Sequence, residues 1–428
     1  MMEKDLPEGW EEVQLGEIIK VSSGDGLTSK QMNSEGEIPV FGGNGINGYH
    51  DIANTFEKTI VIGRVGFYCG CVHLTPEKAW VTDNALKVKY PIGYIDQNYL
   101  FWVLTSLNLR QFTGSTAQPV ISGTKIYERE IPLPPLAEQK RIVAKLNAAF
   151  GLLDRMKERL ARIPELLKTF RQAVLTQAVT GKLTEEWREE NGFEEEWKFE
   201  LAKDCCIKVQ SGGTPKPDGF SDIGIPFLKV YNIVNNNIDF HYRPQFVTQE
   251  AHNSRLKKSI CLPGDVLMNI VGPPLNKIAI IPNTYKEWNH NQAITLFRTK
   301  NYLINTFLYY FFCEGSSVKS LYNETRGVVG QVNISLSQCR EFEIPIPPLA
   351  EQQEIVRRVE ALLAKADALE AQYLSLKEKI DRLPQALLAQ AFRGELVAQD
   401  PTDEPAAVLL EKIKGSKVSG KGKQGILF

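Results

Sequence analysis

The chain has 428 residues, with 50 lysines and arginines against 51 aspartates and glutamates, and 43% of its residues are hydrophobic. These values describe a soluble globular protein that is long enough for two or three domains. No run approaches the ~18 apolar residues of a membrane span, and the acidic start at 1–5 does not resemble a signal peptide. Seven cysteines without an export signal indicate reduced thiols, so we expect a cytoplasmic protein.

Residues 1–130 are predicted to form a mixed α/β globular domain. An amphipathic segment at 10–21 leads into a Ser/Gly turn at 22–26, and a helix is predicted over 98–112. Short apolar runs that are typical of strands lie at 38–41, 59–65, 69–74 and 85–88.

A long helical segment follows at 131–183. It opens with the run Ile131-Pro132-Leu133-Pro134-Pro135-Leu136-Ala137-Glu138-Gln139. From Ile142 to Val174 an apolar residue recurs in steps of four and three, which is the heptad pattern of supercoiled helices. Gly181 suits the position just after a helix C-terminus, and Pro164 is predicted to kink the helix.

The same segment returns 213 residues later, at 344–396, with 20 identical residues over 53 paired positions and no gap. A repeat of this length indicates two copies of a domain-sized unit. Gly394 takes the place of Gly181, and Pro384 is predicted to kink the second helix. A helix of about 45 residues reaches roughly 65 Å, which favours a coiled coil over an amphipathic helix on an ordinary core. The predicted seam consists of Ile142, Leu146, Leu153, Leu160 and Leu167 with Ile355, Leu362, Leu369, Leu376 and Leu383.

Residues 197–343 repeat the plan of residues 1–130 more loosely. The matching segments are Trp10 and Trp197, 19–24 and 207–212, and 60–66 and 266–272. The predicted order is therefore globular domain, long helix, globular domain, long helix. An acid-rich linker is expected at 184–196. Residues 397–428 are expected to add a short helix at 405–414 and a disordered stretch rich in Gly, Lys and Ser at 415–423.

Several short motifs could carry chemistry, and each has a plainer interpretation. The G-x-G-x-x-G pattern at 43–48 lacks the following helix and the later acid of a dinucleotide site, so we expect a glycine-rich turn that places Asn44 and Asn47 near a groove. Cys69, Cys71 and His73 would share one side of a strand, but without a fourth ligand they do not predict a metal site.

No catalytic site is predicted either. Residues 272–275 lack the flanking residues of an amino-methyltransferase Pro-Pro motif. The five histidines are scattered, with no acid partner or nucleophile at a recognisable spacing.

The doubled motifs resemble the specificity (S) subunits of type I restriction–modification systems over essentially the full length. The residues that carry the resemblance are 132–139 and 345–352, Gln172 to Ala178 and Gln385 to Ala391, Gly181-Lys182-Leu183 and Gly394-Glu395-Leu396, and the opening Leu6 to Trp10 with Leu15-Gly16-Glu17.

The resemblance implies an α+β fold with a pseudo-twofold internal repeat. Residues 1–130 and 197–343 would be target recognition domains, and the segments 131–183 and 344–396 would pair as an antiparallel coiled coil. It further implies double-stranded DNA, two methyltransferase subunits and restriction/translocase subunits as partners. The chain itself would bind no cofactor, with S-adenosylmethionine and ATP expected on the partner subunits.

DNA contacts are predicted from side-chain chemistry. Asn and Gln pair with adenine, Arg and Lys pair with guanine, and Lys, Arg, Ser and Thr hold phosphates. The net charge is −5 over 1–130 (11 basic, 16 acidic residues) and +4 over 197–343 (16 basic, 12 acidic), so any contact must come from a local groove. The predicted contacts are Asn44, Asn47, Lys58, Arg64, Asn84 and Gln118 in the first domain, and Lys216, Lys229, Asn232, Arg243, Lys257, Asn269, Lys277, Gln292, Arg326, Gln331 and Asn333 in the second.

Other functions stay open at this point. A coiled-coil scaffold that binds no DNA would agree with the acidic first domain. A specificity subunit of a methyltransferase-only system would share the same sequence features. A self-sufficient methyltransferase or nuclease is disfavoured, because no cofactor loop and no clustered carboxylates accompany the repeat.

Overall fold

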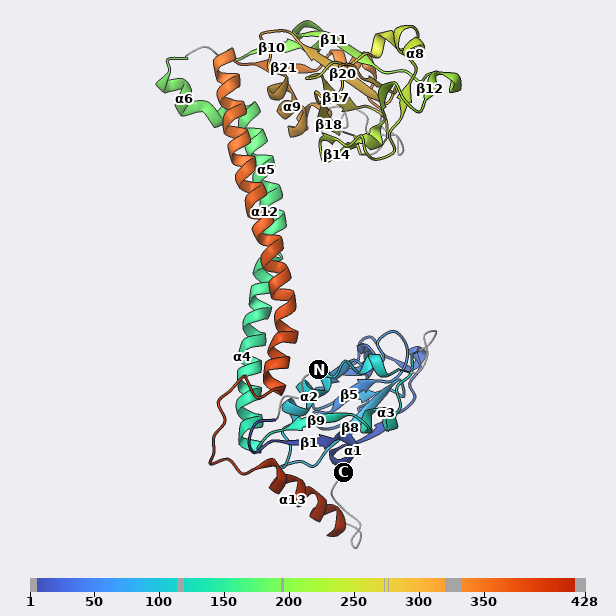
Figure 1. The fold of residues 1–428 in the computed structure, drawn as a ribbon, viewed down its shortest axis with the longest axis vertical. Coiled ribbons are helices and arrows are strands. Elements are labelled where there is room, and N and C mark those ends of the chain that lie inside the picture. Colours follow the sequence, from blue (N-terminus) through green and yellow to red (C-terminus); the bar gives the residue numbers. More distant parts are fainter. Residues whose placement is uncertain are drawn as a thin grey trace. The chain divides into compact units, whose positions relative to one another are not determined.

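The computed structural model describes residues 6–113, 119–193, 196–272, 274–275, 277–319 and 333–419 (Figure 1). The chain divides into two compact units, which are described one at a time. Unit 1 comprises residues 1–161 and 375–428, and unit 2 comprises residues 162–374. Each unit contains one globular domain and the helical segments that pack on it. Within the described residues, no helix is both long and apolar enough to cross a membrane.

The globular domain of unit 1 is built on three small sheets. Strands β1 (Glu11–Gln14) and β9 (Glu130–Leu133) form an antiparallel pair. The four-stranded sheet has the order β2 (Lys20–Ser23), β8 (Ala85–Lys89), β5 (Ile60–Gly63), β6 (Val72–Leu74). The three-stranded sheet has the order β4 (Gly45–His50), β3 (Ile38–Gly42), β7 (Trp80–Val81), and β3 runs parallel to β7. The helices are α1 (Leu15–Ile18), α2 (Gln97–Ser106) and α3 (Gly123–Tyr127), with 3-10 turns at Ser29–Gln31 and Leu109–Phe112.

Strand β5 is buried along its whole length because it separates two apolar layers. Ile60 and Ile62 face the main core, whereas Val61 faces a smaller cluster with Phe41 and Val81. This alternation is the two-residue period of a strand. The C-terminal helix α13 (Ala406–Ser419) belongs to the same unit and buries apolar residues against its main core.

Unit 2 repeats this plan with longer loops. Strands β10 (Lys198–Leu201) and β21 (Glu343–Ile346) pair antiparallel. One four-stranded sheet has the order β11 (Cys206–Ser211), β20 (Ile294–Thr299), β17 (Val266–Asn269), β18 (Ile278–Ile280). Another has the order β12 (Phe220–Ser221), β16 (Phe246–Val247), β13 (Ile225–Leu228), β19 (Asn289–His290). A hairpin, β14 (Ile233–Val234) and β15 (Asn237–Ile238), completes the strands. The helices are α6 (Glu185–Glu190), α7 (Ala202–Cys205), α8 (Gln249–Asn253), α9 (Asn305–Glu314) and α11 (Leu336–Arg340), with 3-10 turns at Lys182–Thr184, Pro217–Gly219, Val230–Asn232 and Lys257–Ser259.

The internal repeat predicted from sequence is confirmed in these pairings. The β1–β9 pair corresponds to β10–β21, and the sheet order β2-β8-β5-β6 corresponds to β11-β20-β17-β18. The parallel pair β3–β7 corresponds to β13–β19. The repeat therefore includes the strand order and the strand direction as well as the sequence motifs.

The long helical segments begin after the strands that the Pro-rich motif ends. The first copy is two helices, α4 (Leu136–Leu160) and α5 (Ile163–Val179), and the second is one helix, α12 (Leu349–Phe392). Pro164 lies in the first turn of α5, so the first copy is interrupted between two helices instead of being one kinked helix. Pro384, by contrast, lies inside a helix that continues past it. Gly181 and Gly394 have positive φ angles of 76° and 70°, as predicted for residues that follow a helix C-terminus.

Helices α5 and α12 pair antiparallel within unit 2. Arg171 donates a hydrogen bond to the Glu370 carboxylate at 2.9 Å, whereas Arg358 donates to the backbone oxygen of Leu183, also at 2.9 Å. The later residue, Leu183, thus contacts the earlier position on α12, as expected for antiparallel packing. In unit 1 the corresponding packing puts Ile142 and Leu146 of α4 in one core cluster with Leu388 of α12.

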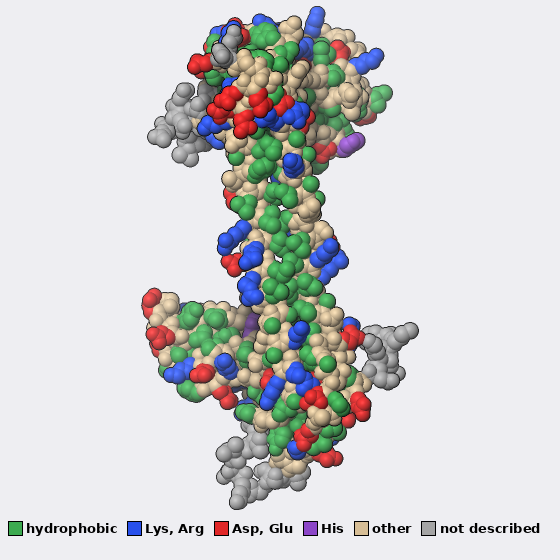
Figure 2. Space-filling model, turned by 90° about the vertical axis from the view of Figure 1, so that its left-hand side faces the viewer, with side chains coloured by type: hydrophobic (Ala, Val, Ile, Leu, Met, Phe, Trp, Pro, Cys, Tyr) green, Lys and Arg blue, Asp and Glu red, His purple; other side chains and the backbone are tan. Residues whose placement is uncertain are grey.

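The predicted seam is correct for the first helix copy but wrong for most of the second. Ile142, Leu146, Leu153, Leu160, Leu167 and Ile355 are buried, and Leu362 is partly buried. Leu369, Leu376 and Leu383 are 55%, 44% and 40% exposed. The α12 residues that are buried instead include Val359, Ala366, Ile380 and Leu388. In each helix copy, one of the two heptad rows is therefore mostly buried and the other is mostly exposed. Hydrophobic side chains are visible along the helices in Figure 2.

The amphipathic segment predicted at 10–21 is a strand, a helical turn and the start of a second strand. Three smaller predictions differ from the structure. The helix at 98–112 is divided at Asn108, which has a φ of 45°. Residues 67–70 form a turn, with Gly70 at φ 87°, so the strand predicted at 69–74 begins only at Val72. Residues 415–419 continue α13 rather than being disordered; 420–423 lie outside the described residues.

Candidate nucleic-acid interface

The repeated Pro-rich motif anchors each globular domain to its helix through a buried carboxylate. In unit 1 the indole N–H of Trp10 donates to Glu138 Oε2 at 3.0 Å. In unit 2 the indole N–H of Trp197 donates to Glu351 Oε2 at 2.9 Å. Both glutamates are buried, so the hydrogen bond satisfies a group that would otherwise be costly to bury.

The glutamine that follows each glutamate fixes a second point of the same junction. Gln139 accepts from the backbone N–H of Asp96 at 2.9 Å and donates to the Pro134 oxygen at 3.0 Å. Gln352 accepts from the N–H of Ile304 at 2.8 Å and donates to the Pro347 oxygen at 2.8 Å. The start of a domain helix, α2 or α9, is thereby held against the start of the long helix in each unit.

Different segments cover the two anchors. In unit 1 Gln399, which follows α12, donates to Glu138 Oε1 at 3.2 Å, and Asp403 accepts from Arg141 at 2.7 Å. Burial raises the pKa of Glu138, although the hydrogen bonds from Trp10 and Gln399 oppose that rise. In unit 2 Thr184, which follows α5, donates to Glu351 Oε1 at 2.7 Å, and Arg188 Nε lies 3.4 Å from the same oxygen.

Three of the predicted contacts in unit 1 come together on one loop cluster. The Arg64 N–H donates to the Asn84 oxygen at 2.9 Å, and a Cβ placed on Gly43, next to Asn44, would lie 3.2 Å from the Val65 oxygen. Asn44 and Asn84 are exposed and Arg64 is partly exposed. The G-x-G-x-x-G pattern is a turn followed by strand β4, as predicted, with Gly45 at φ 85°.

The same cluster contains exposed aromatic residues that were not among the predicted contacts. Phe67 and Tyr68 occupy the turn between β5 and β6 and are 67% and 43% exposed. The Arg110 guanidinium lies 4.4 Å from the centre of the Phe67 ring. In the sequence, this exposed aromatic site is indicated by an aromatic pair directly after Gly66, in the loop between two predicted strands. Of the remaining predicted contacts, Asn47 lies exposed on β4, Lys58 lies apart beside a cleft lined by Lys87 and Gln97, and Gln118 lies outside the described residues.

Three predicted contacts in unit 2 belong to one loop system between β13 and β16. Lys229 is partly exposed and Arg243 is exposed, but Asn232 is completely buried. Its side chain bonds only to backbone groups of the loops around it. Asn232 is therefore a scaffold residue in this structure and presents no edge to a base.

The other predicted contacts of unit 2 are more dispersed. Gln292 accepts a hydrogen bond from Thr214, close to Lys216, and both Gln292 and Lys216 are exposed. Asn269 is buried, and its side chain accepts from the Lys277 N–H at 2.7 Å and donates to the Pro274 oxygen at 3.0 Å. It too is therefore a scaffold residue. Lys257 and Asn333 are exposed at separate places, Lys277 is partly exposed, and Arg326 and Gln331 lie outside the described residues.

A buried thiol–imidazole pair in unit 2 has the composition of a nucleophile but the wrong environment for one. Cys261 Sγ lies 3.0 Å from His290 Nδ1, and both residues are fully buried. Burial raises the pKa of Cys261 well above its usual value and lowers the pKa of His290 to about 4. Both groups are therefore neutral near pH 7, which is the opposite of an activated thiolate.

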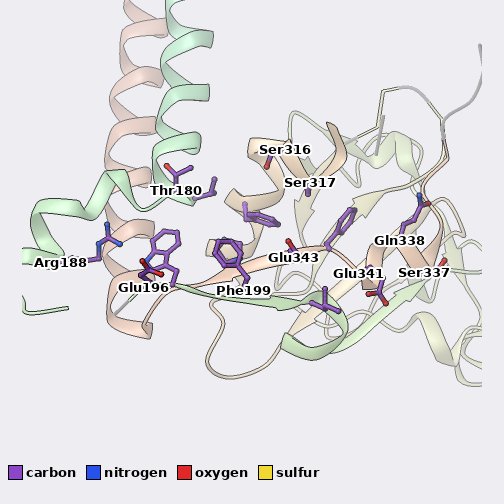
Figure 3. A pocket seen from close by; sticks show the side chains of 16 residues that line it. Thr180, Arg188, Glu196, Phe199, Ser316, Ser317, Ser337, Gln338, Glu341 and Glu343 are labelled. Atoms are coloured by element: carbon purple, nitrogen blue, oxygen red, sulfur yellow. The ribbon is translucent and has the colours of Figure 1, made fainter. Parts of the chain in front are cut away.

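A cavity with a volume of about 1200 Å³ also lies in unit 2 (Figure 3). Its lining combines aromatic rings such as Phe199 with hydroxyls such as Ser337 and carboxylates such as Glu343. No histidine or cysteine is among the lining residues, and within the described parts of the chain no cluster of three potential metal ligands is found.

Comparison with known proteins agrees with this arrangement. The family model for the type I restriction modification DNA specificity domain matches residues 7–165 and again residues 194–378. The type I restriction enzyme EcoKI specificity subunit of Escherichia coli K12 is 34% identical over 307 residues, which is 69% of this chain and 65% of that protein. The EcoDI specificity subunit of Escherichia coli is 29% identical over 98% of both chains. The crystal structure of the HsdS subunit from Thermoanaerobacter tengcongensis superposes with a TM-score of 0.60 at 19% identity, covering 92% of this chain and 99% of that one.

The chain therefore belongs to the type I restriction–modification DNA specificity family, and two copies of the family's domain account for most of its length. It is a specificity subunit of a type I restriction–modification system.

Proposed function

We propose that each globular domain reads one half of a bipartite, asymmetric DNA target, and that the helical segments set the unread spacer between the halves. One observation carries this proposal: the same frame, anchored by Trp10–Glu138 and by Trp197–Glu351, supports two unlike loop surfaces. A duplicated frame suits two half-sites on one duplex, and unlike loops suit unlike half-sites.

The surface chemistry of the two domains supports direct contact with DNA. Unit 1 gathers Asn44, Arg64 and Asn84, which are suited to base edges and phosphates, beside the exposed ring of Phe67. Unit 2 presents Lys229 and Arg243 from one loop system and Lys216 and Gln292 from another. Apart from Phe67, these residues are the contacts we retain from the predicted set, and Asn232 and Asn269 are assigned to the scaffold instead.

The open heptad row of each helix copy is the proposed docking surface for two methyltransferase subunits. Apolar residues of these rows that stay exposed include Met156, Phe170, Leu369 and Leu376, at 38%, 40%, 55% and 44%. A contiguous apolar surface that stays exposed often marks a site of contact with another protein. The reaction would then take place on these partners, which would bind S-adenosylmethionine, while restriction/translocase subunits would bind ATP. This chain would contribute no catalytic group, and the complex would act in the cytoplasm.

The proposal is tested by purifying the chain alone and together with a type I methyltransferase subunit. Each preparation is incubated with genomic DNA and S-adenosylmethionine, and the methylated positions are sequenced. We expect methylation only with the complex, at a motif of two unlike half-sites separated by a fixed gap. Methylation by the chain alone would contradict a non-catalytic role, and a complex without sequence preference would favour a scaffold. Adding the restriction subunit and ATP separates a restriction system from a methyltransferase-only system by DNA cleavage.

A further inference from the structure

The loop between β15 and β16 in unit 2 presents an exposed tyrosine and an exposed arginine side by side. Tyr242 is 48% exposed, and the guanidinium carbon of Arg243 lies 5.2 Å from the centre of the Tyr242 ring. A second ring, Tyr231, packs edge-on against Tyr242 with centroids 5.9 Å apart. The guanidinium thus rests on a supported aromatic surface, which limits the conformations it can adopt.

A buried asparagine holds this loop in shape. Asn232 Oδ1 accepts from the Lys229 N–H at 3.0 Å, and its Nδ2 donates to the Asp239 oxygen at 3.1 Å and to the Tyr242 oxygen at 2.9 Å. The Asp239 carboxylate caps the turn by accepting from the N–H groups of His241 and Tyr242. The backbone of the loop is therefore fixed from inside before any ligand arrives.

Arg243 also has an unusual backbone conformation. Its φ angle is 51°, in the left-handed region that residues with long side chains rarely adopt. Its oxygen accepts a hydrogen bond from the Tyr231 hydroxyl at 3.3 Å, which helps to hold that conformation. Residues kept in such regions by their surroundings occur often at functional sites, and here the conformation projects a long cationic side chain from the loop.

The chemistry of the loop selects an acceptor-rich ligand. Within the described residues no ion pair involves Arg243, and the nearest acid in sequence, Asp239, is engaged by two backbone donors. A fixed guanidinium with parallel N–H donors matches two adjacent acceptor atoms in a plane. In the major groove of DNA that pattern is the O6 and N7 edge of guanine.

We propose that Arg243 reads a guanine in the second half-site, and that Asn232 is the positioning residue that holds the reading loop. This inference rests on the proposed function, since it assigns one base pair of the target to one side chain. Tyr242 supports the guanidinium from one side and leaves its N–H edge open to the base. A phosphate contact by the same arginine would give affinity without sequence information.

The test uses the full chain assembled with its methyltransferase subunit and a DNA library with random half-sites. Arg243→Asn removes the guanidinium and keeps a residue type that tolerates positive φ, so folding is preserved. We expect this variant to lose preference at one G·C pair of the second half-site by about tenfold to a hundredfold, with the first half-site unchanged. Arg243→Lys retains the charge without the fork and should lose most of that preference while keeping overall methylation.

Two further variants separate reading from charge and from folding. Asn232→Ala should relax the same G·C position, because the loop loses three hydrogen bonds, and its thermal unfolding is measured in parallel. Arg255→Asn removes an equal charge from another exposed position and should leave the motif unchanged. An Arg243→Asn motif identical to the wild type overturns the inference, as does a loss spread evenly over all sites. A wild-type complex with no sequence preference would instead contradict the proposed function.

Discussion

The two globular domains are anchored by the same pair of side chains but are covered by different segments. Glu138 is closed over by Gln399, from the segment after α12, whereas Glu351 is closed over by Thr184 and Arg188, from the segment after α5. The junction between domain and helix is therefore repeated in the two units. The segments that cover the buried glutamate differ between the units, and so do the loops of the domains. A frame of this kind allows each reading surface to change without altering how it is attached.

The largest effect should come from removing one anchor. Glu351→Ala leaves the Trp197 N–H and the Thr184 hydroxyl without their acceptor and Arg188 without its carboxylate, which we expect to destabilise unit 2 by about 4 kcal/mol. The change is measured by urea unfolding followed by tryptophan fluorescence. Glu138→Ala should have a comparable effect on unit 1.

Gln353→Ala, at the exposed position two residues further along α12, is the matched control and should change stability by no more than about 0.5 kcal/mol. A Glu351→Ala chain within 1 kcal/mol of the wild type would show that the anchor is not what holds the domain.

The next effect separates the two heptad rows of α12. Ala366 is completely buried and Leu369 is 55% exposed. Ala366→Asp places an unpaired charge in the helix pair and should cost about 3 kcal/mol of stability. Leu369→Asp should leave the isolated chain nearly as stable as the wild type but prevent assembly with the methyltransferase subunit, as measured by gel filtration. If Leu369→Asp assembles normally, the open row is not the docking surface.

A smaller effect depends on pH and distinguishes unit 2 from unit 1. The pKa of His290 is lowered from 6.5 to about 4, first by burial and also by the charge of Lys208. Between those two pH values the unfolded chain binds more protons than the folded chain, so stability falls as the pH is lowered and levels off below about 4. By pH 5 we expect a loss of about 2 kcal/mol from this group.

Urea unfolding of the wild type and of His290→Gln from pH 8 to pH 4 measures this contribution. The neighbouring Cys261 does not add to it, because burial raises its pKa. His73 in unit 1 also has a lowered pKa but is only partly buried, so His73→Gln should change the slope less. Equal slopes for the wild type and His290→Gln would contradict the assignment.

Much of the fold could be predicted because its largest signals are periodic or repeated. The offset of 213, the heptad ladders and the glycines that end the helices all have a direct physical meaning in the sequence. The phase of the buried row on α12 could not be predicted in the same way. Both rows are apolar, and which one is buried depends on where the neighbouring helix lies.

The candidate interface was predicted only in part, for a related reason. Side-chain chemistry selected Asn and Arg residues that are exposed in the structure, but an asparagine that contacts a base and one that holds a loop in shape look alike in sequence. Asn232 and Asn269 proved to be of the second kind, and their buried environment arises from contacts distant in the chain. The role of Glu138 was missed because its partner, Trp10, lies 128 residues away.

The most direct measurement is the target of a chain in which residues 197–343 are replaced by residues 10–130. Both segments begin at the anchoring tryptophan and end just before the Pro-rich motif, so each junction is preserved. If the two domains are independent readers on one frame, the assembled complex will methylate a symmetric target made of the first half-site twice. A methylated motif that still contains the original second half-site would contradict the account.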